Sequence, residues 1–244
     1  MNHMSPLRKT ALVAGILYLL TFVSIPSPFF LYGQVRNNPQ YILGPGPDTP
    51  VFFGGILEII VALAGIGTAV ALYPVLKRQN EGVALGFVGS RVLEAAGILA
   101  GVACLLAIVS LRQAGAGTGA LVTGQTLAIL YDRIFLLSQS LMPAVNDLLL
   151  GFLLYQSRLV PRVLPLLAFI GAALLVANDI AVLFSLWGRT STPAALAALP
   201  VALFEFSLGV YLIVKGFKPS PILSSDTRDA SAAAATNPSA SRRP

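Results

Sequence analysis

The sequence predicts an all-α polytopic membrane protein, a bundle of six transmembrane helices with cytoplasmic N- and C-termini. Three observations predict this fold class. Of the 244 residues, 56% are hydrophobic and only 11% are charged, whereas soluble domains carry about 25% charged residues. The mean hydropathy is +0.80. The apolar residues also gather in six runs, each long enough for the roughly 20 residues that cross a hydrocarbon core.

The six apolar runs define a transmembrane domain, residues 1–218. The first run follows a basic start, as in a signal peptide, but it continues to Leu31 without a small-residue cleavage site. It therefore predicts a helix that stays in the chain. The predicted helices lie near residues 11–31, 51–76, 83–111, 124–155, 163–187 and 194–217. Residues 219–244 lack an apolar face and predict a disordered cytoplasmic tail.

Basic residues predict the orientation of the helices, because Lys and Arg gather in cytoplasmic loops. One side of the predicted bundle carries eleven of them: Arg8, Lys9, Lys77, Arg78, Arg158, Arg162, Lys215, Lys218, Arg228, Arg242 and Arg243. The other side carries three: Arg36, Arg112 and Arg189. This asymmetry predicts that both termini are cytoplasmic. The cytoplasmic loops 77–82 and 156–162 are short, which predicts that the two helices joined by each loop pack as antiparallel neighbours.

Composition excludes several kinds of chemistry. The net charge of +6 comes from Lys and Arg scattered between apolar runs, which is typical of membrane topology and not of a nucleic-acid-binding patch. The one cysteine, Cys104, rules out an internal disulfide and a multi-cysteine metal site. The one histidine, His3, rules out HExxH zinc chemistry and a Ser-His-Asp triad. The sequence predicts no cofactor, no metal and no nucleic-acid partner; it predicts the lipid bilayer as partner and specifies no oligomeric state.

Six of the ten acidic residues fall inside the predicted helices, where a charge facing lipid costs roughly 2.5–3.5 kcal/mol. Counting ~1.5 Å per residue from the cytoplasmic boundary places one group ~12–16 Å deep, near the middle of a core about 30 Å thick. This predicted central layer comprises Arg91, Glu94, Asn146, Asp147 and Glu205. A second group lies ~24–35 Å from that boundary. This predicted outer layer comprises Glu58, Asp132, Arg133, Asn178 and Asp179.

Arg91 and Glu94 lie three residues apart and share one helical face. Gly97 and Gly101 follow on the same stripe and form a small-residue packing motif, so this face is predicted to point into the bundle. In a structural interpretation, Arg91 only bridges Glu94 and an acid on a neighbouring helix. The ratio of three acids to one Arg in the central layer favours a functional interpretation. Either acids there are protonated, or a cation or basic ligand completes the site.

Pro143 predicts an irregularity in the fourth helix, because proline removes a backbone donor and clashes with the preceding turn. It lies close to Asn146 and Asp147. Kinks beside polar residues occur where membrane proteins bind ligands. A kink that only relieves packing is the alternative interpretation.

Three segments carry a resemblance to a known family. They are AGILYLLTFVSIP (14–26), ALYPVLKRQNEGVALGFVGSRVLEAAGIL (71–99) and MPAVNDLLLGFLLYQSRLVPRVLPLLAFIG (142–171). The chain up to about Lys218 resembles the bacterial membrane family catalogued as domain of unknown function 4386. The resemblance implies a six-helix integral protein of the bacterial plasma membrane, and it implies no activity. Arg91, Glu94, Asn146 and Asp147 lie within the segments that make the family recognisable.

The leading functional hypothesis is a protein that binds or translocates a small cation, a proton or a polar solute. The solute would enter from the outer face through a polar cavity lined by the intramembrane acids and Arg91. One alternative is an intramembrane or membrane-surface enzyme that uses a carboxylate as acid or base, which the lack of a second cysteine, a helical histidine and a cofactor motif disfavours. Another is a non-catalytic subunit or sensor whose buried ion pairs only set packing.

Overall fold

The computed structural model describes residues 4–24 and 30–223, and every regular element in these ranges is helical. The long helices are α1 (Pro6–Ser24), α4 (Thr49–Leu76), α5 (Glu81–Gln113), α6 (Leu121–Phe135), α7 (Met142–Ser157), α8 (Val163–Leu183) and α9 (Thr192–Val214). A π-helical segment, η3 (Leu136–Leu141), joins α6 to α7. The short helices α3 (Gly33–Asn37), η1 (Tyr41–Leu43) and η2 (Thr118–Ala120) lie in the connections.

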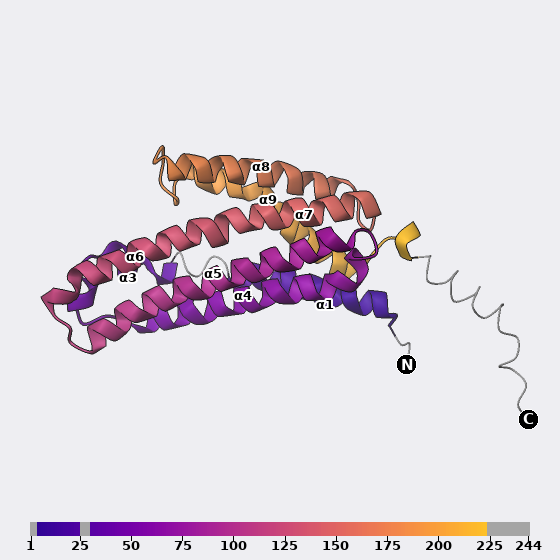
Figure 1. Cartoon of the computed structure of the whole chain (residues 1–244). Coiled ribbons are helices and arrows are strands. Elements are labelled where there is room, and N and C mark those ends of the chain that lie inside the picture. The colour runs from indigo at the N-terminus through magenta and orange to yellow at the C-terminus, as the bar shows by residue number, and fades with distance from the viewer. Residues whose placement is uncertain (1–3, 25–29, 224–244) are drawn as a thin grey trace, which may run out of the picture.

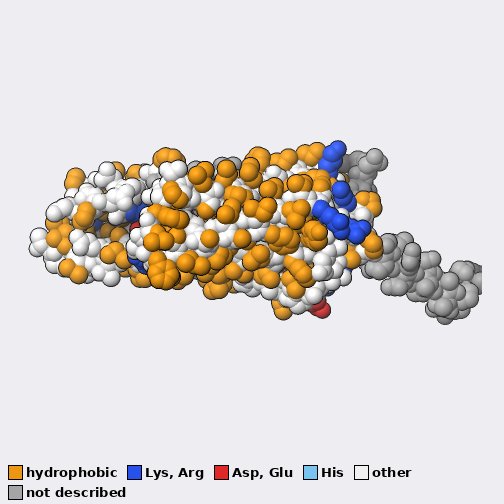
Figure 2. Space-filling model, turned by 90° about the horizontal axis from the view of Figure 1, so that it is seen from above, with side chains coloured by type: hydrophobic (Ala, Val, Ile, Leu, Met, Phe, Trp, Pro, Cys, Tyr) orange, Lys and Arg blue, Asp and Glu red, His pale blue; other side chains and the backbone are white. Residues whose placement is uncertain are grey.

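Five helices of the described chain are long and apolar enough to cross a membrane: Thr49–Leu76, Glu81–Gln113, the continuous stretch Thr118–Ser157, Val163–Leu183 and Thr192–Val214. The shorter α1 runs beside them but does not meet the same criterion. Large apolar side chains cover the outside of the bundle, and Lys and Arg gather at one end of the face seen in Figure 2. Such an apolar exterior is consistent with a protein embedded in a membrane.

The long helices form a closed ring. Along the chain, α1 packs on α4, α4 on α5, α5 on α6 and α7, α7 on α8, and α8 on α9. The ring closes because α1 also packs on α9. The predicted small-residue face of α5 is confirmed: a Cβ on Gly97 would clash with the Cβ of Ser138 in η3. The glycine therefore lets α5 approach the π-helical segment closely.

Each predicted helix has a counterpart in the structure, with differences at the ends. The first, predicted over 11–31, begins at Pro6 and is described to Ser24; residues 25–29 lie outside the described part of the chain. The fifth ends at Leu183 and not at residue 187, because Ser185 takes a left-handed conformation (φ 59°) in the turn that follows. Residues 219–223, at the start of the predicted tail, belong to the described part of the chain. Ser220 is buried and donates a hydrogen bond to the carbonyl of Ser157, whereas residues 224–244 lie outside the described ranges.

The irregularity expected at Pro143 takes the form of a π-helix. Pro143 has no backbone N–H to donate to the preceding turn, and the six residues Leu136–Leu141 in front of α7 are wound as a π-helix. Such segments are rare and frequent at functional sites. Here the segment presents Gln139 and Ser140 to the interior, where both line the cavity described below.

One end of the molecule extends beyond the α8–α9 turn (Figure 1). The 33 residues of α5 make a helix ~50 Å long, whereas the 21 residues of α8 span ~32 Å. At this extended end α3 and η1 pack against α5 and α6 around a separate core, with the aromatic residues Tyr32, Tyr41 and Tyr131. We call this end the cap.

Ion pairs and hydrogen bonds tie the cap together at the start of α4. Asp48 pairs with Arg112 and accepts hydrogen bonds from Gln113 Nε2 and Tyr41 Oη, both at 2.8 Å. Desolvation by burial would raise the pKa of Asp48, but these donors outweigh it and the net shift is downward. The carboxylate is therefore held ionised where α4 begins.

Candidate functional site

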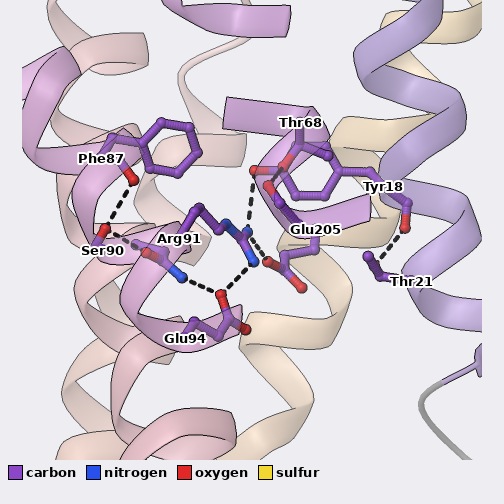
Figure 3. A network of polar contacts seen from close by, with 10 residues as sticks. Tyr18, Thr21, Thr68, Phe87, Ser90, Arg91, Glu94 and Glu205 are labelled. Atoms are coloured by element: carbon purple, nitrogen blue, oxygen red, sulfur yellow. Dashed lines mark hydrogen bonds and ion pairs between the residues drawn. The ribbon is translucent and has the colours of Figure 1, made fainter. Parts of the chain in front are cut away.

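Arg91 of α5 lies at the centre of a buried ion-pair cluster (Figure 3). Its Nη1 donates to Oε2 of Glu94 at 3.0 Å, one helical turn away on α5. Its Nη2 donates to Oε1 of Glu205 on α9 at 2.6 Å. The three residues are 4%, 7% and 7% exposed. One guanidinium therefore pairs two carboxylates from two helices, in the geometry that suits its planar donors.

Neighbouring polar side chains extend this cluster to α1 and α7. Asn146 Nδ2 donates to Oε2 of Glu94 at 2.7 Å, and Ser90 Oγ donates to Oδ1 of Asn146 at 2.5 Å. Tyr18 of α1 accepts a 3.4 Å hydrogen bond from Arg91 Nη2 and places its ring 5.6 Å from the guanidinium carbon. The central cluster, defined by Tyr18, Ser90, Arg91, Glu94, Asn146 and Glu205, thus joins helices α1, α5, α7 and α9.

Asp147 follows Asn146 on α7 and lies at the level of the central cluster, but it takes no part in the hydrogen-bond network of that cluster. Its side chain is 0% exposed, and neither carboxyl oxygen has a hydrogen-bond partner among the described residues. Arg91 Nε is likewise buried without a partner there. The centre of the bundle thus holds two unused acceptor atoms and one unused donor, a rare condition for buried polar groups.

The predicted outer layer resolves into three separate sites. Glu58 is 0% exposed and accepts hydrogen bonds from Tyr131 Oη (2.9 Å), Gln139 Nε2 (3.1 Å) and Tyr32 Oη (3.3 Å). It therefore links α4 to the cap and to η3. Its three donors are of types that the sequence analysis did not single out, because tyrosine and glutamine also occur at packing positions.

The second outer site surrounds Asp179 on α8. Its Oδ1 accepts hydrogen bonds from Ser140 Oγ of η3 and from Asn178 Nδ2. Asn178 in turn accepts a 3.0 Å hydrogen bond from Trp187 Nε1 in the α8–α9 turn. The π-helical segment is therefore linked to α8 through Ser140.

Asp132 forms the third outer site, at the edge of the cap. It is paired at 2.8 Å with both Arg36 of α3 and Arg189 of the α8–α9 turn. Its side chain is 44% exposed, unlike those of Glu58 and Asp179, which are buried. Arg133 is exposed and lies outside these contacts. Both residues precede the π-helical segment and lie near the extended end of the molecule.

A cavity of about 410 Å³ connects the central cluster with the end of the bundle that carries the α8–α9 turn. Arg91, Glu94 and Glu205 line one part of it, and Gln139, Asn178 and Arg189 line another. Between them the walls carry apolar side chains such as Ile98, Leu175 and Val201. Every helix of the ring contributes to the lining, and the volume falls in the range of about 300–1,000 Å³ typical of small-molecule sites.

The residue types in the cavity limit the chemistry that it can support. Among residues 4–24 and 30–223, no group of three or more His, Cys, Asp or Glu side chains is placed to hold a metal ion. Cys104 is buried in the cap core, away from the cavity. What remains is a set of two carboxylates, two arginines and hydrogen-bonding amides at the two ends of an apolar chamber. This arrangement suits recognition of a charged or polar group attached to an apolar body.

Comparisons with known proteins place the chain in a family without supplying an activity. No curated protein and no solved structure matches the chain. One family model, described as Domain of unknown function (DUF4386), matches residues 13–216. The match spans the helical ring from α1 to α9 and includes the whole central cluster. The chain therefore belongs to the DUF4386 family.

Proposed function

We propose that this protein binds or translocates a small cation, a proton or a polar solute through the cavity, which opens toward the outer face of the bacterial plasma membrane. The observation that carries the proposal is the cavity itself, which reaches from Arg189 at the outer end to Arg91, Glu94 and Glu205 at the centre. Buried ionisable groups inside a membrane bundle are expensive and mark solute or ion pathways. A cavity that ends on such groups supports the same function.

The charges at the central end of the cavity favour a positively charged or hydrogen-bond-donating group on the ligand, and Arg189 is the charged residue at the other end. Glu94 and Glu205 both line the cavity, and they share a single guanidinium, that of Arg91. The ionised trio therefore has a net charge of −1, by one arginine against two carboxylates. The apolar walls between the two ends suit an apolar body on the same ligand.

We further propose six membrane spans with both termini in the cytoplasm, α1 being the first span. Arg8 at the start of α1 donates a 2.8 Å hydrogen bond to the carbonyl of Leu212 near the end of α9. The two described chain ends therefore lie at the same end of the bundle (Figure 1). That end also carries the basic loops 77–82 and 156–162, as the positive-inside rule requires of a cytoplasmic side.

A reporter fusion tests this orientation. A reporter that works only in the cytoplasm, fused after Lys218, should be active, and the same reporter inserted at Gly44 in the cap should be silent. A reporter that works only outside the membrane should give the opposite pattern at the two positions. Activity of the external reporter after Lys218 would overturn the proposed orientation and, with it, the outward opening of the cavity.

Ligand-induced stabilisation tests the binding function. We expect at least one compound in a panel of inorganic cations, organic amines and polar metabolites to raise the melting temperature of the purified protein, because a ligand stabilises the folded state that binds it. Replacing Ala202, which lines the cavity one turn from Glu205, by Phe should abolish this shift. The neighbouring Leu203 faces outward, since it is 47% exposed, so Leu203→Phe should keep the ligand-induced rise in melting temperature. Equal shifts in both variants would place the ligand elsewhere.

A purely structural role for the cluster is the competing proposal, and one observation favours it. Arg91 already satisfies an oxygen of Glu94 and an oxygen of Glu205, so these ion pairs need no ligand to persist. If no compound of the panel shifts the melting temperature, the structural role replaces the binding function.

A further inference from the structure

Two carboxyl groups in this bundle are equally buried but have opposite surroundings. Glu58 and Asp147 are both 0% exposed. Glu58 accepts three hydrogen bonds, from two tyrosine hydroxyls and one amide. Asp147 accepts none from the described residues, at either oxygen. An ionised carboxylate can only accept hydrogen bonds, and without donors its burial costs far more than that of a neutral acid.

The charged groups around Asp147 do not supply what it lacks. Asp147 lies on α7, and its electrostatic neighbours are Glu205 of α9 together with Arg91 and Glu94 of α5, with Tyr18 of α1 also within range. The only cation in this set is Arg91, whose Nη atoms are already bonded to Glu94 and Glu205. An ionised Asp147 would thus be a third carboxylate against one guanidinium. No metal-ligand group exists among the described residues to offset it.

We propose that Asp147 is a proton-binding site: its carboxyl group holds a proton in the arrangement described here and gives it up when Arg91 turns toward it. The unused Nε donor of Arg91 and the unused acceptors of Asp147 are the two halves of a contact that is absent in this arrangement. This inference deepens the proposed function, on which it rests, by naming the proton as the ion that is linked to solute binding.

The exchange balances in charge. With Asp147 neutral, the charges of Arg91, Glu94 and Glu205 sum to −1. A monovalent cation that binds Glu94 or Glu205 frees part of the guanidinium, which then pairs with Asp147. The O–H bond of Asp147 breaks, the proton passes to water, and the new carboxylate restores the sum of −1. One cation enters for each proton that leaves.

Infrared spectroscopy of the purified full-length protein tests the first half of the proposal without any ligand. A protonated carboxyl group has a C=O stretch well separated from the bands of carboxylates. We expect this band in the wild-type protein at pH 7, and we expect Asp147→Asn to remove it. Glu58→Gln is the matched control and should leave the band in place. Asp179→Asn, a change at the other aspartate with an unpartnered buried oxygen, should also leave the Asp147 band in place.

Carbon-13 labelling keeps the test valid if Asp147→Asn fails to fold. In wild-type protein grown with labelled aspartate the band should move to lower frequency, because the vibrating carbonyl carbon is heavier. A band that stays unmoved, or that Glu58→Gln removes, would overturn the proposal. So would a wild-type spectrum without a protonated carboxyl band.

The link to Arg91 is tested by the pH at which the band disappears. Glu94→Gln removes a neighbouring negative charge and releases a guanidinium donor, so the band should be lost at lower pH than in the wild type. An unchanged midpoint would overturn the link between Asp147 and Arg91. The infrared result and the ligand panel are independent readouts, so a protonated Asp147 in a protein that binds no compound would overturn the proposed function alone.

Discussion

Replacing Arg91 by Ala should cost about 3–5 kcal/mol of unfolding free energy, the usual effect of removing one side of a buried ion pair. The substitution leaves Glu94 and Glu205 in the interior without the guanidinium that pairs them. Glu94 keeps only its hydrogen bond from Asn146, and among the described residues Arg91 is the one hydrogen-bond donor to Glu205. Arg91→Lys should recover only part of the loss, because an ammonium group does not bridge two carboxylates as a planar guanidinium does.

The loss in Arg91→Ala should be larger at pH 8 than at pH 5. Stranded buried carboxyl groups in the folded variant bind protons more tightly than they do in the unfolded chain, so folding takes up protons and stability rises as pH falls. The melting temperature in detergent measures this at both pH values. Adding Glu94→Gln and Glu205→Gln to Arg91→Ala should restore most of the loss at neutral pH, through coupling between contacting residues. If the stability losses of the separate substitutions simply add in the combined variant, and the loss in Arg91→Ala does not depend on pH, then Arg91 does not stabilise these carboxylates.

Replacing Gly15 by Val should lower stability by about 1–3 kcal/mol, the usual cost of overpacking. A Cβ on Gly15 would lie only 2.7 Å from the backbone oxygen of Gly209 on α9. Backbone atoms of a packed helix cannot yield as the end of a flexible side chain does, so α1 must move away. This displacement would open the ring between its first and last helices and carry Tyr18 away from Arg91.

Gly89→Val is the matched control, because a Cβ on Gly89 meets nothing within 4 Å. Valine has a somewhat higher intrinsic helix propensity than glycine, so this variant should be neutral or slightly more stable. The comparison uses melting temperatures of both variants in the same detergent. A Gly15→Val protein as stable as Gly89→Val would mean that the close α1–α9 contact contributes nothing to the fold.

The helices were predictable because apolar runs of membrane-crossing length are a strong signal. The relative heights of polar residues along neighbouring helices follow from the constant rise of ~1.5 Å per residue. Counting along three separate helices placed Glu94, Asn146 and Glu205 at one level. In the structure Glu94 and Glu205 both accept hydrogen bonds from Arg91, and Asn146 donates one to Glu94. Sequence spacing alone also predicted the pair of Arg91 with Glu94 on one helical face.

The partners across helices were not predictable, because helical rise gives the height of a side chain and says nothing of the direction in which it points. Asn146 joins the arginine network whereas the adjacent Asp147 does not, and this difference depends on how α7 is rotated about its own axis. The π-helical segment before Pro143 was not predictable either. That segment depends on how backbone carbonyls find partners around a proline, which residue types do not reveal. The pairing of Asp132 with Arg36 and Arg189 joins two connections to α6, so it depends on loop paths.

The contact between α1 and α9 can form only after the rest of the ring has been synthesised. Translation starts at the N-terminus, so Arg91, Glu94 and Asn146 are synthesised before Glu205 of α9. Until α9 arrives, the arginine lacks the partner that its Nη2 contacts at 2.6 Å, and the cavity lacks one wall. Among the helices of the ring, α9 is therefore the last to be synthesised, and it both closes the ring and completes the pairing of the central arginine.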